Sequence, residues 1–412
     1  MNKKSVVPKY RFPEFKDSRT VNLENGNVIF EPINNKKHNS DLPVLAISQE
    51  YGAIPREQID YNVSVSEKSL NSYKIVEVGD FIISLRSFEG GIEYSTWHGI
   101  CSPAYIILRK RVPIVEQYYK YYFKTDKYIK DLNKDLEGIR DGKMVSYVQF
   151  SNILLPNPDI KEQQKIADCL ISLDELIATE VEKLALLKTH KKGLMQKLFP
   201  AEGKTVPEWR FPEFRDSEEW ERKILGDLGV LISGLTYSPD DVRENGLLVL
   251  RSSNIQNNSI ALDDNVYVRE DIGGANYSAK NDILICVRNG SKSLIGKNAL
   301  LPKDLPLCTH GAFMTVFRSE TPKFVFQLLQ TEVYSKQVKA DLGATINSIN
   351  GNNLRKYVFY VPKNFREQQK IADFLSSVDE KITAQSEKIQ TLKLHKKGLM
   401  QGLFPSMQEV FE

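Results

Sequence analysis

Two long stretches of the chain carry hydrophobic residues spaced alternately three and four positions apart. Polar residues interrupt both rows at equivalent places, Glu180 and Lys191 in the first and Gln385 and Lys396 in the second. A mean period of 3.5 residues is typical of helices that pair in a coiled coil. The pattern therefore predicts two long helices whose contact is made by Leu170, Leu173, Ile177, Leu184, Leu187, Leu194, Leu375, Val378, Ile382, Ile389, Leu392 and Leu399.

The two stretches are copies of one sequence. Residues 162–200 and 367–405 agree at 26 of 39 aligned positions and end in HKKGLMQKLFP and HKKGLMQGLFP. Upstream, YRFPEFKDS at 10–18 returns as WRFPEFRDS at 209–217. Between these anchors the match weakens but keeps its order, since GDFIISLR (79–86) corresponds to NDILICVR (281–288). Repetition on this scale indicates one structural plan used twice.

Connectivity sets the direction of the helices. Only nine residues, 201–209, separate the end of the first helix from the second RFPEF, and the second helix follows directly on the second variable region. If the helices pack on each other, they must therefore run antiparallel, with one globular domain at each end. About 38 residues at 1.5 Å per residue give a rod of roughly 57 Å.

The variable regions predict mixed α+β domains. Residues 79–86, 104–111, 281–288 and 312–320 have the composition of strands, and residues 116–136 and 324–342 that of amphipathic helices. The expected fold class is α+β, with two pseudo-symmetric globular domains separated by two long helices in an antiparallel coiled coil. The expected bounds are 1–158 and 201–363 for the globular domains and 159–200 and 364–412 for the helices.

Composition narrows the protein class only a little. A chain of 412 residues is long enough for two or more domains, and a net charge of +3 permits nucleic-acid binding without arguing for it. We expect no membrane association, because no run approaches 18 apolar residues and the first ten residues lack the apolar stretch of a signal peptide. The four cysteines stand apart from one another, which favours reduced thiols in a cytoplasmic protein.

Motifs for catalysis are missing from the sequence. The chain has NPDI at 157–160 where an amino-methyltransferase needs NPPY or DPPY, and GSKSLIGKN at 290–298 departs from the phosphate-binding loop in spacing and in its last residue. The five histidines show no metal-ligand spacing. The sequence therefore predicts a non-catalytic protein that binds no metal or cofactor itself.

Two variable domains, each followed by an EQQKIADxL…HKKGLMQxLFP helix, resemble the specificity subunits of type I restriction-modification enzymes. The resemblance covers essentially the whole chain and includes GLTYSPDDV…LLVLRSSNIQ of the second domain, whereas the first domain has VLAISQEYGAIPREQ in that place. It implies a reader of double-stranded DNA whose two target-recognition domains each recognise one half of a split, asymmetric site. It also implies docking of two methyltransferase subunits and, through the complex, of restriction subunits. S-adenosylmethionine, ATP and Mg²⁺ would belong to those partners.

Polar and glycine-rich loops beside the strands are the expected DNA-contacting segments, because Arg, Lys, Asn, Gln and Ser are common readers of base edges. These loops are SQEYGAIPR and RSFEGG in the first domain and RSSN, RNGSK and THG in the second. Arg86 and Arg288 occupy equivalent positions after paired strands. The lysines of YYKYYFKTDKYIK are candidates for phosphate contacts. The candidate DNA-binding residues are Ser48, Gln49, Arg56, Arg86, Lys143, Arg251, Ser253, Asn254, Arg288, Asn289, Lys292 and His310.

Two alternatives remain open at this stage. The chain could serve a related system in which methylase and nuclease are fused in one polypeptide. It could also be a structural coiled-coil protein without a DNA role, although two variable domains on a repeated frame argue against that. The recognised bases, the spacer length and the partner stoichiometry do not follow from the sequence.

Overall fold

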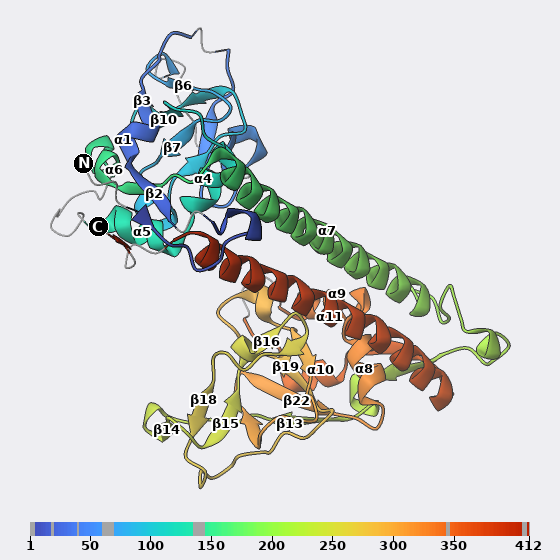
Figure 1. Cartoon of the computed structure of the whole chain (residues 1–412). Helices are drawn as coiled ribbons and strands as arrows, with labels where there is room; N and C mark the ends of the chain where they lie inside the picture. The colour runs from blue at the N-terminus through green and yellow to red at the C-terminus, as the bar shows by residue number, and fades with distance from the viewer. Residues whose placement is uncertain are drawn as a thin grey trace. The chain divides into compact units, whose positions relative to one another are not determined.

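The computed structural model describes residues 5–17, 20–38, 41–59, 70–134, 145–342, 347–405 and 410–411 (Figure 1). The chain divides into two compact units: unit 1 comprises residues 1–181 and 387–412, and unit 2 comprises residues 182–386. The two predicted helices are present as α7 (Ile160–Leu198) and α11 (Phe365–Leu403), each of 39 residues. Each helix contributes one part to unit 1 and the other part to unit 2.

Each unit contains the same four-stranded antiparallel sheet. In unit 1 the strand order is β3-β10-β7-β8, formed by Phe30–Ile33, Ile106–Lys110, Phe81–Ile83 and Glu93–Tyr94. In unit 2 the order is β13-β22-β19-β20, formed by Val230–Ser233, Met314–Arg318, Ile283–Cys286 and Asn298–Leu300. The strands expected from GDFIISLR and NDILICVR are β7 and β19, and every residue in both is buried. The α+β fold class with two pseudo-symmetric domains is therefore confirmed.

A buried ion pair recurs at the same place in both sheets. Asp80, 1% exposed, binds Arg109 through two hydrogen bonds of 2.8 and 2.7 Å, and Asp282, 2% exposed, binds Arg318 through two of 2.8 Å. Each carboxylate also accepts a backbone N–H three residues upstream. Hydrogen bonding to the carboxylate raises the pKa of both arginines. The pair ties the turn before the buried strand to its neighbouring strand in each copy.

The remaining strands differ more between the units. A short antiparallel pair beside the start of each long helix is common to both: β2 (Val21–Asn25) with β11 (Leu154–Pro156), and β12 (Glu221–Ile224) with β23 (Val358–Val361). Unit 1 then has the hairpin β4 (Leu45–Ser48) and β5 (Gly52–Pro55), the pair β6 (Lys74–Val76) and β9 (Gly99–Cys101), and β1 (Ser5–Val6) between β2 and β24 (Val410–Phe411). Unit 2 has a sheet β14-β18-β15-β21, formed by Val242–Arg243, Val266–Val268, Leu247–Leu250 and Cys308–His310, and the pair β16 (Ile255–Gln256) and β17 (Ser259–Ile260).

The helices expected over 116–136 and 324–342 are each interrupted, so the expectation of a single helix was wrong. The observed helices are α4 (Glu116–Tyr122) and α5 (Asp126–Asn133) in unit 1, and α8 (Pro322–Leu328) and α9 (Glu332–Leu342) in unit 2. Thr125 and Thr331 lie at the break, and each side-chain oxygen accepts the backbone N–H three residues later. A threonine in this role starts a new helix rather than continuing the old one. Shorter helices are α1 (Gly26–Ile29), α3 (Ser87–Gly90), α6 (Tyr147–Asn152) and α10 (Gly351–Arg355).

The repeated RFPEF segment fastens each unit to a long helix. The Arg11 guanidinium donates two hydrogen bonds of 2.6 Å to Glu162 in the first turn of α7, and Arg210 donates two of 2.7 Å to Glu367 in the first turn of α11. Both glutamates are buried. The backbone just before each arginine bonds to the end of the other long helix, since Tyr10 N–H donates to the Gly402 carbonyl and Trp209 N–H donates to that of Lys197.

Inside each unit the two long helices run antiparallel. In unit 1 Asp174 binds Lys396 at 2.5 Å and Glu180 binds Lys388 at 2.5 Å. The residue numbers therefore rise along α7 as those of the facing residues fall along α11. In unit 2 Lys191 binds Asp379 at 2.6 Å, which is the repeat equivalent of the Asp174–Lys396 pair. The twelve apolar residues expected at the contact are all buried or half-buried, whereas Leu176, Val181, Leu186 and Leu394 on the same helices are exposed.

Candidate nucleic-acid interface

In unit 2, three loops come together to form what we term the unit 2 loop cluster. Arg288 follows β19, and its guanidinium lies over the ring of Phe313, 5.6 Å from the ring centroid. The Arg288 backbone N–H donates to the Phe313 carbonyl at 3.1 Å, which fixes the loop after β19 against the loop before β22. Both side chains are exposed, Phe313 at 57%. A guanidinium stacked on an exposed ring presents a flat apolar surface and several N–H donors at the same place.

The third loop of the cluster follows β15. The Asn289 side-chain amide donates to the Ser252 hydroxyl at 3.0 Å, so residues 251–254 adjoin residues 288–292. Ser253 is exposed at this edge, and Arg251 forms an ion pair with Asp264 at 2.9 Å. Lys292 begins a short 3-10 helix (Lys292–Leu294) and is also exposed. The structure therefore brings together five candidate residues, namely Arg251, Ser253, Arg288, Asn289 and Lys292.

Two candidates of unit 2 are buried, and the structure contradicts their assignment as DNA contacts. Asn254 is 0% exposed, and its amide donates to the carbonyls of Ala261 and Asp264, so the side chain closes the loop from inside. His310 is also 0% exposed; its ring bonds to Ser278 and to the Ile232 carbonyl, and burial lowers its pKa. The THG segment was expected to be a loop, but its first two residues complete β21.

In unit 1 the candidate residues divide into two groups. Ser48, Gln49 and Arg86 lie together, because the Gln49 amide donates to the Arg86 carbonyl at 3.1 Å and the Ser48 hydroxyl accepts two backbone N–H groups of the turn that follows it. Arg86 itself is exposed. This turn of residues 49–51, which we term the unit 1 hairpin tip, joins β4 to β5.

Arg56 lies away from that tip, so the expectation that SQEYGAIPR forms one loop was wrong. Gly52 adopts φ +73°, a conformation that favours glycine, and turns the chain back into β5. Arg56 follows the far end of β5, where its backbone N–H donates to the Val44 carbonyl. Lys143, the remaining candidate, lies outside the described residues.

Sequence reasoning missed several exposed residues at these loops. Phe313 was assigned to a strand, yet it lies one residue before β22 and supports Arg288. Tyr51 at the unit 1 hairpin tip is 61% exposed. An aromatic residue within two positions of a glycine at the boundary of a strand was the available signal in both cases.

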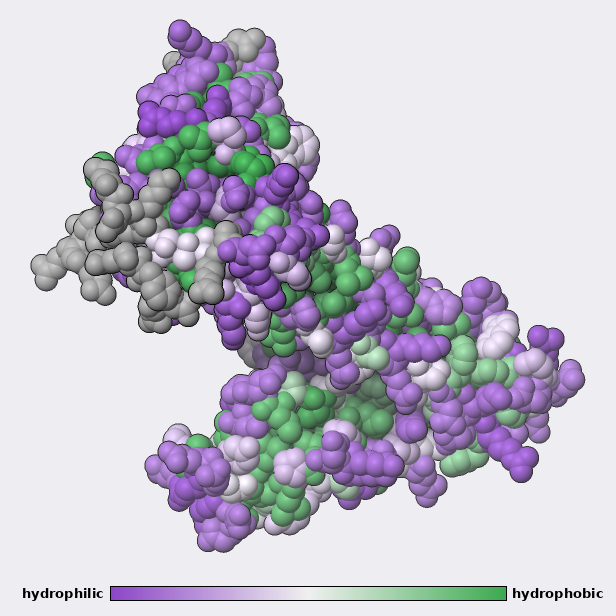
Figure 2. Space-filling model, in the orientation of Figure 1, coloured by the Kyte–Doolittle hydropathy of each residue, from purple (hydrophilic) through white to green (hydrophobic). Residues whose placement is uncertain are grey.

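A second exposed feature follows the long helices. Leu176, Val181 and Leu186 occur every five residues along α7 and are exposed, as is Leu394 on α11. Hydrophobic patches along α7 are visible among hydrophilic residues in Figure 2. Because an α-helix turns by about 100° per residue, a spacing of five places these side chains on different sides of α7, so they are single exposed apolar residues and not one contiguous surface.

The chain is similar in sequence to proteins of type I restriction-modification systems. A family model for the "Type I restriction modification DNA specificity domain" matches residues 217–394. The specificity subunit of the type I restriction enzyme MjaVIII from Methanocaldococcus jannaschii is 26% identical over 359 residues, covering 81% of this chain and 80% of that protein. These matches support a type I restriction-modification specificity subunit. The EcoKI specificity subunit of Escherichia coli K12 is 28% identical over 199 residues, 45% of this chain and 42% of that protein.

The fold is also similar to those of solved proteins from type I restriction-modification systems. The type I restriction-modification S subunit from M. genitalium superimposes with a TM-score of 0.57 at 14% identity, covering 97% of this chain and all of that one. A chain from a structure concerned with complex assembly and conformational transition of the type I R-M system gives a TM-score of 0.55 at 15% identity over 98% of both chains. Among the described residues, no helix is long and apolar enough to cross a membrane, and no group of three or more His, Cys, Asp or Glu could hold a metal ion.

Proposed function

We propose that this specificity subunit reads a bipartite, asymmetric DNA site, with unit 1 reading one half and unit 2 the other. One observation carries the proposal: the two copies keep the same sheet order and the same buried ion pairs but present different exposed loops. A duplicated frame with different loops suits two readers of two different sequences.

The reading surfaces we assign are the unit 1 hairpin tip with Arg86 and the unit 2 loop cluster. In unit 1, Gln49 and Arg86 can present an amide and a guanidinium to the major groove. In unit 2, Arg288 and Asn289 can do the same, and Phe313 can contact a thymine methyl group or a sugar. These residue types form bidentate contacts to guanine and adenine, each worth about 1–3 kcal/mol of discrimination.

The partners we assign are two methyltransferase subunits, which dock on the long helices. The near-identical sequences of α7 and α11 support this assignment, because a duplicated helix offers one binding surface twice. Restriction subunits join through the complex. S-adenosylmethionine, ATP and Mg²⁺ are bound by those partners. This chain is a non-catalytic, cytoplasmic subunit. Isolated chain that transferred radiolabelled methyl groups to DNA would contradict this part of the proposal.

A domain exchange tests the two-reader proposal. Residues 10–157 are replaced by the corresponding domain of another specificity subunit, and methylated adenines are mapped by sequencing the genome of the strain. One half of the methylated site should change and the other half should stay, because each unit has its own hydrophobic core and sites without shared contacts act independently. An exchange that altered both halves would mean that the two domains read DNA as one body.

The spacing between the half-sites gives a second test. We expect the long helices to set this spacing, so inserting one heptad after Glu182 and a matching heptad between Ser386 and Glu387 should move the readers by roughly 10 Å. Both half-sites should persist in the methylation map while their separation changes or methylation ceases. Unchanged separation in a folded variant would exclude the helices as the ruler.

Two other functions are distinguished by simple observations. A system with methylase and nuclease fused in one polypeptide would use the same reader, and co-purification would then recover one large partner instead of separate methyltransferase and restriction subunits. A structural coiled-coil protein would show no preference for any DNA sequence in a binding assay.

A further inference from the structure

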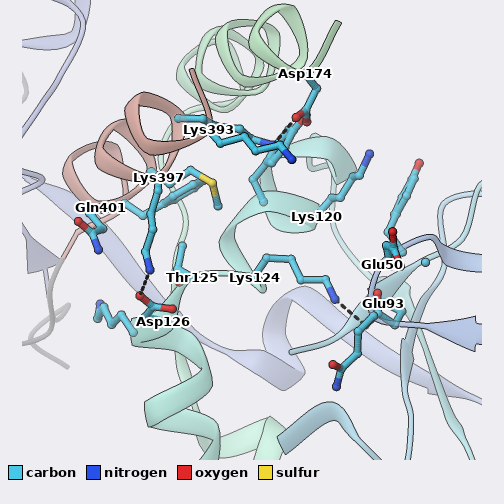
Figure 3. A pocket seen from close by; sticks show the side chains of 18 of the residues that line it. Glu50, Glu93, Lys120, Lys124, Thr125, Asp126, Asp174, Lys393, Lys397 and Gln401 are labelled. Atoms are coloured by element: carbon cyan, nitrogen blue, oxygen red, sulfur yellow. Dashed lines mark hydrogen bonds and ion pairs between the residues drawn. The ribbon is translucent and has the colours of Figure 1, made fainter. Parts of the chain in front are cut away.

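A hollow in unit 1 collects lysine side chains from two parts of the chain (Figure 3). The segment that contains α4 and α5 contributes Lys120, Lys124, Lys127, Lys130 and Lys134. The last part of α11 contributes Lys393, Lys396 and Lys397, the last two from the repeated HKKGLMQ phrase. The cavity has a volume of about 1110 Å³, and all its lining residues belong to unit 1.

The hollow keeps an excess of positive charge. Eight lysines face five carboxylates in its lining, a formal balance of +3. Four of the carboxylates are already bound by a lysine, in the pairs Glu93–Lys124 (2.5 Å), Asp126–Lys397 (3.3 Å), Asp131–Lys134 (2.6 Å) and Asp174–Lys396 (2.5 Å). Figure 3 shows the first two of these pairs on the two sides of the hollow.

Four lysines of the hollow form no ion pair with a carboxylate in the described part of the chain, namely Lys120, Lys127, Lys130 and Lys393. Lys120 lies over the rings of Tyr94 and Tyr121, and Lys127 donates to the Pro405 carbonyl. Burial lowers the pKa of Lys120 and lowers that of Lys127 to about 8. Partly desolvated ammonium groups held near one another are stabilised by a bound anion.

The hollow borders the surface assigned to DNA reading. Gln49, Glu50 and Tyr51 of the unit 1 hairpin tip form part of its lining, and Gln49 also holds the Arg86 carbonyl. A ligand in the hollow would therefore lie beside the loops that read bases.

Unit 2 does not repeat this charge. The positions equivalent to Lys120, Lys124, Lys127 and Lys134 carry Phe326, Gln330, Val333 and Ala340. Lys336 matches Lys130, but it binds Glu202 at 2.9 Å. The α11 lysines do have counterparts in Lys188, Lys191 and Lys192. Because the same frame folds in unit 2 without the α4 and α5 lysines, the fold itself does not require them.

We propose that the lysine hollow of unit 1 binds the phosphodiester backbone of DNA beside the half-site that unit 1 reads. The inference rests on the proposed function and adds an asymmetry to it: unit 1 holds the backbone more strongly than unit 2. Each phosphate neutralised by a lysine releases condensed counterions, so the logarithm of the binding constant falls with the logarithm of salt concentration by about 0.9 per contact.

The test uses the full-length chain and two fluorescent duplexes, one with the methylated site and one with that site scrambled. The variant Lys130→Gln/Lys393→Gln removes two exposed lysines that hold no carboxylate. Its matched control is Lys336→Gln/Lys188→Gln at the repeat-equivalent positions of unit 2. The test variant should reduce the salt slope by about 1.8 and weaken binding roughly 50-fold at 0.1 M salt on both duplexes. The control should keep the wild-type slope.

Each outcome decides the inference. An unchanged slope in the test variant, or an equal loss in the control, overturns it. Loss of the preference for the site over the scrambled duplex also overturns it, because backbone contacts carry no base information. If the wild-type chain shows no preference between the duplexes, the proposed function fails instead, whatever the slopes are.

Discussion

Units 1 and 2 keep identical chemistry where the fold is assembled and differ where the surface meets solvent. Arg11–Glu162 and Arg210–Glu367 fasten the two lead-in segments with the same bidentate geometry. By contrast, the strand β4 continues to Ser48 and turns into a hairpin, whereas the chain leaves β15 at Leu250 and enters a short 3-10 helix (Ser252–Asn254). The buried ion pairs, which require a fixed geometry, are the same in both units. The exposed loops differ between the units in length and in residue type.

The two units also differ in one contact that joins the sheet to the helical segment packed beside it. In unit 1, Lys124 binds buried Glu93, whereas in unit 2 Gln330, at the position equivalent to Lys124, binds the Asn298 side chain at 2.5 Å. A charged pair thus occupies one unit and a neutral pair the other. Since both sheets have the same strand order, this site tolerates either chemistry as long as each buried polar group has a partner.

The largest effect should come from removing Glu162 or Glu367, the buried carboxylates that bind Arg11 and Arg210 at equivalent positions of the two units. Glu162→Ala and Glu367→Ala each remove the carboxylate that binds an arginine only 10% exposed, and each should cost about 3–5 kcal/mol of unfolding free energy. Urea denaturation measures both. Glu14→Ala and Glu213→Ala, which break exposed pairs with Lys165 and Lys370, should cost far less, because solvent screens an exposed ion pair. A large cost in only one of the two units would show that the frames are not equivalent.

A disruption of the helix contact should come next. The double variant Leu184→Asp/Leu187→Asp places two charges at half-buried positions of α7, where an unpaired charge costs several kcal/mol. Helix pairing in unit 2 should weaken, and methyltransferase binding, followed by size exclusion, should be lost with it. Lys188 directly follows Leu187 and is exposed, so the surface variant Lys188→Asp should leave complex formation intact.

Lys124→Gln should sharpen the contrast between the charged and the neutral pair. Burial raises the pKa of Glu93 above its ordinary value of 4.5, and Lys124 partly opposes that rise. In the variant the opposing cation is gone, so ionising Glu93 in the folded state becomes harder. The cost should be small below pH 4.5, where the carboxyl is protonated in both states, and should grow to about 2 kcal/mol as the pH rises towards 7.

The control for that titration is Lys124→Gln/Glu93→Gln, which supplies a neutral pair like the one in unit 2. Its stability relative to wild type should depend much less on pH over the same range. Equal pH dependence of the single and double variants in urea denaturation would show that Glu93 is not the responsible group.

The smallest effect should come from a hydrogen bond that both units make with different residues. The Tyr121 hydroxyl donates to Asp174 at 2.7 Å, and the Gln327 amide donates to Asp379 at 2.8 Å. Tyr121→Phe should cost about 1 kcal/mol, because Asp174 keeps its bond to Lys396. Thermal unfolding of Tyr121→Phe beside Gln327→Met measures the two contributions, and a cost above about 3 kcal/mol would show that the aspartate depends on this donor.

The sequence was sufficient for the parts of the molecule that repeat. A period of 3.5 residues locates α7 and α11, and the shared GDFIISLR and NDILICVR stretches locate β7 and β19. Periodicity could not place the break at Thr125, since the hydroxyl competes for a backbone N–H only once the chain turns there. Asn254 and His310 are of residue types that often bind ligands. Only the structure shows that their polar atoms form hydrogen bonds within the protein. The lysine hollow was equally hidden, because its two walls are about 260 residues apart in sequence.

Unit 1 is built from two separate stretches of the sequence, and this affects the order of folding during synthesis on the ribosome. Its core includes Leu403 and Phe404, and Lys396 and Lys397 bind Asp174 and Asp126, so residues 387–405 must emerge before unit 1 can close. Unit 2 is continuous in sequence and is complete once residue 386 has emerged. The half of the protein that is translated first therefore finishes folding last, and until residues 387–405 have emerged its incomplete core is of the kind that chaperones protect.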